Sequence, residues 1–343
     1  MYIDNKHIKK TISLWLITMF FIISIMIVVG GLTRLTDSGL SITKWQLFSG
    51  ILPPFSNDQW IHYFNLYKEI PEYKLQNYLM SLDEFKVIFW WEFIHRFLGR
   101  LIGIFFLLPM IYFTYKIGFK KTKSFYLIFF LICFQGFVGW YMVSSGLVDR
   151  VDVSHYRLAL HLILAFIILS LILWNYLKLN ENIYSVNHIN KILPCSFLIL
   201  IFLQIIIGAF VSGMDAGKIY NTWPMMGADY FPNDSLFKQL FKISAFNDPS
   251  LVQFIHRNLA YIIFFLYILI LFNVYKNKFY DFFKIIKILG YLLFLQIFLG
   301  ILTLLFGAQI FIASMHQISS IFLVSSTIFL LYLTFNTNLQ PSN

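Results

Sequence analysis

Long apolar runs separated by shorter polar segments dominate the chain. Eight of these runs are long enough to cross about 30 Å of hydrocarbon, which takes about 20 residues in an α-helix. They occupy residues 12–30, 88–115, 124–143, 158–177, 192–212, 251–275, 285–306 and 311–335. Such runs lack the alternation of apolar and polar residues that is typical of a membrane β-barrel. The pattern therefore predicts an all-α integral membrane protein with eight transmembrane helices.

The composition supports this class. Of 343 residues, 59% are hydrophobic and 12% are charged, whereas an average soluble domain is about 25% charged. A soluble enzyme, a secreted disulfide scaffold and a disordered chain are therefore excluded. The two cysteines, Cys133 and Cys195, lie within or beside apolar runs, so we expect them to be packing residues rather than a disulfide.

The distribution of charge predicts the orientation of the helices. With the N-terminus inside, the inner segments hold thirteen lysines against three acidic residues, and the outer loops hold ten basic against twelve acidic residues. The positive-inside rule then places both termini in the cytoplasm and the two long loops, 32–87 and 213–250, outside. The net charge of +10 thus reflects topology, and no nucleic-acid partner is expected.

The two halves of the chain repeat each other. Residues Asp37, Gly39, Trp45 and Pro54 recur 178 positions later as Asp215, Gly217, Trp223 and Pro232. The tetrapeptide FIHR at 93–96 recurs at 254–257. Each half holds four helices, an even number, so the halves insert in the same orientation about a pseudo-two-fold axis along the membrane normal. We therefore predict two tandem four-helix bundles, spanning residues 1–180 and 181–343.

Four of the eight histidines lie within the spans. They are His95, His161, His256 and His316, one on each even-numbered span and all near its outer end. A single intramembrane histidine is often only an interhelical hydrogen-bonding group, but two repeated pairs at one depth indicate a function. The other four lie in loops or near helix ends, where we expect solvated side chains: His7, His62, His155 and His188.

Two facing imidazoles in each half fit the axial ligands of a haem iron, because the porphyrin supplies the other four ligands. Zinc fits poorly, since each half offers only two nitrogen ligands. A proton relay would need acidic partners that are nearly absent from the spans.

Polar residues flank these histidines in a repeated pattern. Arg96 and Arg257 directly follow His95 and His256, where they could pair with haem propionates or lie in the membrane interface without a ligand. Three glutamines each stand four residues before a glycine: Gln135 before Gly139, Gln204 before Gly208 and Gln296 before Gly300. This spacing suits close packing beside a planar ligand or beside another helix.

The halves differ three residues before the first histidine of each pair. The first half has Glu92, whereas the second has the neutral Gln253. Glu92 could simply complement the N-terminal end of a helix dipole. Alternatively, the difference is what we expect if the first site performs chemistry involving protons and the second only holds an electron-transfer haem.

Several longer motifs resemble those of one family. The segments GGLTRLTDSGLSITKW, EFIHRFLGRLIG, VSGMDAGKIYNTWPMM and QFIHRNLAY and the final MHQ are similar to the haem A synthase family, in the form typical of mitochondria and related proteobacteria. The resemblance covers nearly the whole chain in the right order. It implies an eight-helix enzyme of the cell inner membrane that oxidises the C8 methyl group of haem O to the formyl group of haem A, for assembly of cytochrome c oxidase.

The resemblance also implies roles for individual residues. His256 and His316 would ligate a resident haem b, His95 and His161 would flank the substrate haem, and Glu92 matches the functional acid of the family. The expected partners are haem O, haem O synthase, a membrane or soluble electron donor and further copies of the chain. The cysteine pair that some bacterial members carry in the first outer loop is missing here, so no cysteine relay is expected.

Two alternatives use the same histidines. A non-catalytic di-haem b electron carrier needs both histidine pairs but not Glu92. A haem transporter needs an open route through the bundle and weaker ligation.

Overall fold

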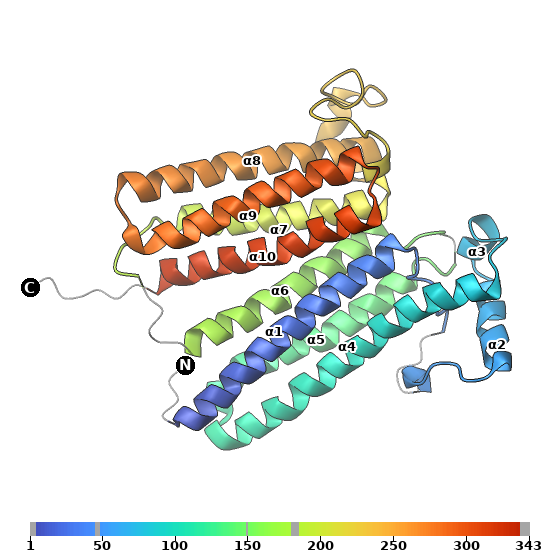
Figure 1. Cartoon of the computed structure of the whole chain (residues 1–343), viewed down its shortest axis with the longest axis horizontal. Helices are drawn as coiled ribbons and strands as arrows, with labels where there is room; N and C mark the ends of the chain where they lie inside the picture. Colours follow the sequence, from blue (N-terminus) through green and yellow to red (C-terminus); the bar gives the residue numbers. More distant parts are fainter. Residues whose placement is uncertain (1–4, 45–48, 149, 180–184, 337–343) are drawn as a thin grey trace, which may run out of the picture. The chain divides into compact units, whose positions relative to one another are not determined.

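The computed structural model describes residues 5–44, 49–148, 150–179 and 185–336. This part of the chain contains eight helices that are long and apolar enough to cross a membrane, so the protein is a multi-pass membrane protein. They are α1 (Lys6–Leu35), α4 (Leu82–Ile117), α5 (Phe119–Val143), α6 (His155–Leu179), α7 (Ile192–Gly213), α8 (Pro249–Lys276), α9 (Tyr280–Leu305) and α10 (Ile310–Phe335). The prediction of an all-α protein with eight such helices is confirmed (Figure 1).

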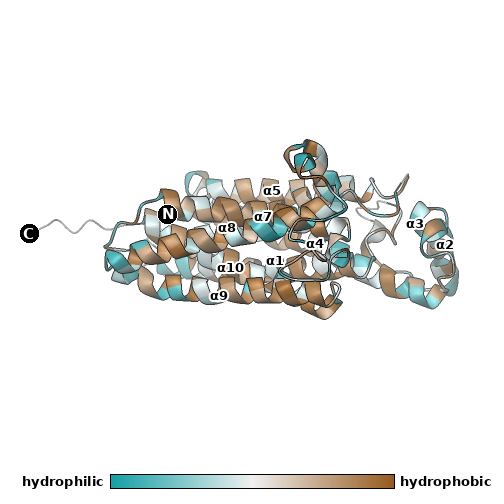
Figure 2. Ribbon diagram, turned by 90° about the horizontal axis from the view of Figure 1, so that it is seen from above, coloured by the Kyte–Doolittle hydropathy of each residue, from teal (hydrophilic) through white to brown (hydrophobic). Residues whose placement is uncertain are grey.

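Local sequence signals mark the starts of two membrane helices. The side chain of Ser81 accepts a hydrogen bond from the Glu84 backbone N–H, and Glu84 accepts one from the Ser81 backbone, so a capping box starts α4. Asp248 caps α8 ahead of Pro249. Polar end residues extend several helices beyond the apolar runs, and Figure 2 shows apolar residues filling the helix middles.

The chain divides into two compact units, one of Phe21–Ala165 and one of Met1–Phe20 with Phe166–Asn343. Their boundaries fall within α1 and α6, whereas the division at residue 180 stays a prediction about the repeat. In the second unit, α7 packs on α8 and α10, and α9 packs on α8 and α10, which makes a four-helix bundle.

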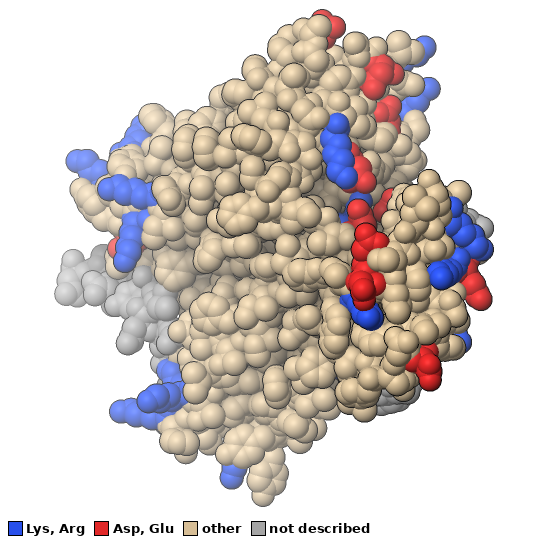
Figure 3. Space-filling view, turned by 45° about the vertical axis from the view of Figure 1, so that its right-hand side comes forward, with Lys and Arg blue, Asp and Glu red and all other residues tan. Residues whose placement is uncertain are grey.

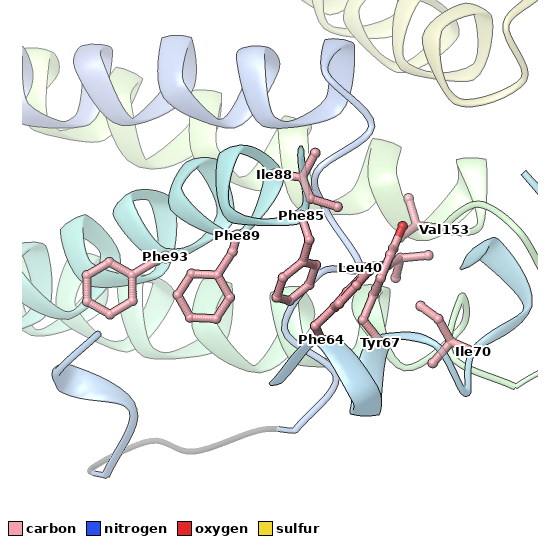
Figure 4. Packing of buried hydrophobic residues seen from close by; sticks show 9 residues of the cluster. All are labelled: Leu40, Phe64, Tyr67, Ile70, Phe85, Ile88, Phe89, Phe93 and Val153. Atoms are coloured by element: carbon pink, nitrogen blue, oxygen red, sulfur yellow. The ribbon is translucent and has the colours of Figure 1, made fainter. Parts of the chain in front are cut away.

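In the first unit, the long polar segment before α4 forms structure of its own. It contains α2 (Asn57–Tyr67) and α3 (Pro71–Leu75), which the hydropathy pattern did not predict. Phe85, Phe89 and Phe93 form a row along α4 that packs against side chains of α2 (Figure 4). The cluster, here called the outer aromatic cluster, is Leu40, Phe64, Tyr67, Ile70, Phe85, Ile88, Phe89, Phe93 and Val153.

The corresponding segment of the other unit is built differently. It contains short 3-10 helices, η2 (Ala216–Lys218), η3 (Phe237–Phe241) and η4 (Ile243–Asn247), in place of α-helices; a further 3-10 helix, η1 (Ser49–Ile51), precedes α2. Acidic side chains gather at one end of the helices, and the other ends carry mainly Lys and Arg (Figure 3).

Candidate functional site

Each intramembrane histidine packs against a glycine of the preceding membrane helix. A Cβ added at Gly30 of α1 would lie 3.1 Å from Nε2 of His95 on α4. The same contact recurs three times with the histidine Cε1, at 3.1 Å for Gly139 with His161, 3.1 Å for Gly208 with His256 and 2.9 Å for Gly300 with His316. Distances this short leave no room for a larger residue, so the glycines let each imidazole lie directly on the neighbouring backbone.

The structure brings the histidines together in pairs within each half. The ring centres of His95 and His161 lie 6.3 Å apart, and His256 is close enough to His316 to interact with it electrostatically. Two imidazole nitrogens on opposite sides of one metal ion would lie about 4 Å apart, twice the length of a metal–nitrogen bond. Ring centres lie further apart than the nitrogens, so the observed separation fits one iron between the two rings.

Glutamines hold three of the four histidines. Nε2 of Gln135 donates a hydrogen bond to the His161 backbone carbonyl at 3.0 Å. Gln204 donates to the His256 carbonyl at 3.0 Å and its Nε2 lies 3.3 Å from the ring Nε2. In the third case, His316 Nδ1 lies 3.0 Å from the backbone carbonyl of Gln296, which can accept its proton. This bond directs Nε2 of His316 towards a ligand, as a backbone carbonyl commonly does for a metal-binding histidine.

Several polar atoms of these pairs lack partners among the described residues. Nδ1 of His161 and Oε1 of Gln135 are buried without a hydrogen bond, and so are Nδ1 of His256 and Oε1 of Gln204. Unsatisfied buried polar atoms are uncommon in folded proteins, so these four fit the lining of a site that binds a further group. All four imidazoles remain half-buried. Two such rings in each half therefore fit a haem, whose iron needs only two protein ligands.

Glu92 belongs to a buried ionic cluster. Its side chain is 2% exposed, and Oε2 accepts hydrogen bonds from Ser41 Oγ and the Ile42 backbone N–H, both at 2.7 Å. Oε1 accepts from Arg96 Nε at 3.0 Å and Nη2 at 2.6 Å, and Arg96 also donates to the Ile42 carbonyl at 2.8 Å. The carboxylate therefore joins α4 to the segment before it.

The arrangement of Glu92, Arg96 and the Ile42 backbone is here called the clamp of the first half. The second half has a matching clamp without the negative charge. Arg257 donates to the carbonyls of Tyr220 and Thr222, each at 3.0 Å, and Tyr220 matches Ile42 at the 178-residue offset. Gln253 takes the place of Glu92, accepting from Arg257 at 3.3 Å and donating to Tyr220 at 3.2 Å. Nε of Arg257 is buried without a partner among the described residues, so this guanidinium has a remaining donor for an anion.

The backbone preserves the repeat as well. Asp37 and Asp215 both adopt left-handed conformations, with φ of 49° and 51°, and aspartate is one of the residues that tolerate this region. The matched residue Trp45 lies outside the described residues, so its pairing with Trp223 stays a prediction.

Two features could not be found from the sequence pattern. Ser41 and Ile42 contact Glu92 across about fifty positions, and no local motif marks them as its partners. His155 was expected to be solvated, which is wrong: it is 6% exposed at the start of α6. Its ring packs on that of Tyr156, with ring centres 4.2 Å apart, and Val153, two residues before it, belongs to the outer aromatic cluster. His7, His62 and His188 are exposed as expected.

Comparison with known proteins gives a consistent result. Residues 13–328 match the cytochrome oxidase assembly protein family, COX15-CtaA. The chain is 51% identical to a protein named heme A synthase of Pelagibacter ubique (strain HTCC1062), over 97% of this chain and 99% of that relative. It is 43% identical to the protein of that name from Rickettsia bellii (strain RML369-C), over 93% and 97% of the two chains. The protein of that name from Rickettsia felis is 40% identical over 92% and 96%.

Proposed function

This chain belongs to the cytochrome oxidase assembly protein family COX15-CtaA, and on that premise we propose that it is an oxidoreductase that converts haem O to haem A. The observation that carries the proposal is its 51% identity, over nearly its full length, to a protein named heme A synthase. The glycine-backed histidine pairs support it, since the reaction needs a porphyrin held inside the membrane.

We assign the resident haem b to the second half, where His256 and His316 would hold its iron. Arg257 would bind a propionate there, because its charge is opposed only by neutral groups and its Nε has no partner among the described residues. When bound, this haem supplies one-electron redox chemistry. Nε2 of Gln204 lies beside the His256 ring, and the backbone carbonyl of Gln296 lies beside the His316 ring, so both would help to orient the imidazoles that hold it.

We assign the substrate haem O to the first half, between His95 and His161. The reaction would be two successive two-electron oxidations of the C8 methyl group, first to an alcohol and then to a hydrated aldehyde, which loses water to leave the formyl group. Each oxidation replaces one C–H bond with a C–O bond and removes two electrons, which a redox partner outside the chain would take up. The protein binds and orients the macrocycle for this reaction. Glu92 and Arg96 form a neutral pair beside this site, and Oε2 of Glu92 would accept a proton released during oxidation.

The charge distribution supports a location in the cell inner membrane, with both termini in the cytoplasm and the long loops in the periplasm. Haem O synthase would deliver the substrate and a membrane or soluble donor would exchange electrons with the protein. Cysteine-accessibility labelling at residues 60 and 235 tests the orientation, because both positions should react with a reagent that cannot cross the membrane.

The activity is tested by expressing the chain in cells that make haem O and identifying the extracted haems by chromatography. We expect haem A to form only when the chain is present. Protein that carries haem b but forms no haem A would contradict the proposed reaction and would favour a di-haem b electron carrier.

A further inference from the structure

The four histidine-bearing helix pairs differ at one position of the partner helix. Four residues before the glycine, three pairs have glutamine: Gln135, Gln204 and Gln296. The fourth pair, α1 with α4, has Met26 before Gly30. Met26 and Gln204 occupy the same place in the repeat, because Gln204 follows Met26 by 178 positions and Gly208 follows Gly30 by the same number. Of the four intramembrane histidines, His95 is therefore the one whose partner helix has no glutamine at this position.

The side chain of Met26 contacts α4 one helical turn after His95. Its terminal methyl is 3.6 Å from the Cβ position of Gly99, four residues after His95. Four residues after their histidines, the other three histidine-bearing helices have residues larger than glycine: Ala165, Ala260 and Ser320. Met26 thus packs against Gly99 in the first half, whereas the second half has Gln204 and Ala260 at the matching positions.

The exchange removes a hydrogen-bond donor. Gln135 and Gln204 each donate to the backbone carbonyl of their histidine, and Gln296 lies 3.4 Å from both ring nitrogens of His316. The methionine thioether has no N–H or O–H to donate and is only a weak acceptor. It can fill the space beside α4 without fixing the position of His95.

We propose that Met26 is a positioning residue that keeps His95 an exchangeable haem ligand, whereas a glutamine contacts each of the other three histidines or its backbone. This inference rests on the proposed function, in which one haem stays and the other enters as substrate and leaves as product. A site that must release its haem needs one ligand that can turn away. A resident site needs two ligands that are held by hydrogen bonds to a second shell of residues.

The test measures the release of haem b from the purified full-length protein in nanodiscs, after loading both sites, to an excess of apomyoglobin. The unmodified protein should release haem in a fast and a slow phase. Met26→Gln should slow the fast phase about fivefold, as expected for one added hydrogen bond. Gln204→Met should accelerate the slow phase by a similar factor. Ser24→Gln adds the same amide to another face of α1 and should leave both phases unchanged.

Turnover gives a second measurement. If Met26→Gln slows product release, both kcat and KM for haem O should fall, which loss of folded protein would not produce. An unchanged fast phase in Met26→Gln, or an equal change in Ser24→Gln, would overturn the proposal. If Met26→Gln fails to fold, an unchanged slow phase in Gln204→Met overturns it instead. Release of haem b does not depend on haem A formation, so an inactive protein with two release phases would refute the proposed reaction and leave this inference standing.

Discussion

The clamps beside the first histidine of each half have the same geometry and different charge. In the first half, Arg96 donates to the Ile42 carbonyl and is neutralised by Glu92. In the second, Arg257 donates to the matching carbonyl of Tyr220, but its side-chain partner is the neutral Gln253. The repeat has kept the backbone contact between arginine and carbonyl and has changed only whether the arginine has a counter-ion.

This difference shows how one duplicated framework can bind the same kind of group in two ways. A paired arginine has already satisfied most of its attraction for an anion, whereas an unpaired one attracts a propionate strongly. Arg257 therefore suits a haem that stays bound. In the proposed first site, the Glu92–Arg96 pair suits a haem that other contacts bind and that has to leave.

The largest effect is expected from removing an axial histidine of the second half. His256→Ala and His316→Ala should each abolish most of the low-spin haem b spectrum, while His95→Ala should leave that spectrum in place. The absorption spectrum of the purified protein measures this directly. The exposed His62 provides a control, since His62→Ala should change nothing. Unchanged spectra in both second-half variants would remove the distinction between the two sites.

The next largest effect should come from making the first clamp resemble the second. Glu92→Gln leaves an amide oxygen that can accept from Arg96, as Gln253 accepts from Arg257, and an NH2 that can donate to Ser41, so the protein should fold and keep haem b although the Ile42 N–H loses its acceptor. Haem A should fall at least about 100-fold, the usual loss when a general base is removed, with the alcohol accumulating. Chromatography of extracted haems measures both products.

A matched control for this variant lies on the same helix. Glu84→Gln removes a carboxylate from the exposed start of α4, about two helical turns before Glu92, and should leave the haem products unchanged. Undiminished haem A in Glu92→Gln at normal protein level would contradict a catalytic role. Glu92→Ala is less informative, because it also removes the side-chain acceptor of the buried Arg96, which should destabilise the protein by about 3–5 kcal/mol.

A smaller effect is expected from a methyl group added behind a ligand. The Cβ in Gly300→Ala would lie 2.9 Å from His316 Cε1, so the ring must shift and retained haem b should fall several-fold. Gly30→Ala should lower it less, because that glycine backs His95 of the exchangeable site. Haem-to-protein ratios measure both. Gly136→Ala is the control, because its Cβ would meet nothing within 4 Å. Alanine is also favoured over glycine in a helix by about 1 kcal/mol. Equal losses of haem b in all three variants would refute the packing argument.

The smallest effect concerns the outer segment, which differs between the halves. Burial, followed by the negative charges of Glu92, Asp152 and Asp37, raises the pKa of Glu72 to about 8. The carboxyl is 3% exposed beside Tyr67, so its protonated form stabilises the fold. In the unfolded segment its pKa returns to about 4.5. The stabilisation is therefore complete below pH 4.5 and is lost as the pH rises through about 8.

Hydrogen exchange of α2 and α3 measures this dependence. Protection should decrease between pH 6 and pH 9 after correction for the intrinsic exchange rate, and Glu72→Gln should remove the decrease. The 3-10 segment of the second half, η3 and η4, has no such carboxyl in its core and should show no comparable trend. A decrease that persisted in Glu72→Gln would mean that another group titrates.

The sequence determined the parts of this protein that depend on local composition. Eight apolar runs must become helices in a membrane, because every backbone N–H and C=O there needs an internal partner. The repeat was also visible, since duplicated helices keep residues such as Asp37 and Asp215 at a fixed offset. The four histidines could be selected because a polar residue in hydrocarbon is costly wherever it points.

Only the tertiary structure decided what each of these side chains touches. Helix periodicity places Glu92 near His95, but its carboxylate turns to Ser41, Ile42 and Arg96, because those donors satisfy a buried charge. The packing of α2 and α3 on α4 depends on the outer aromatic cluster, whose members are brought together from distant parts of the chain. Hydropathy is a property of a residue and its neighbours in sequence, whereas these contacts exist only once the helices have packed.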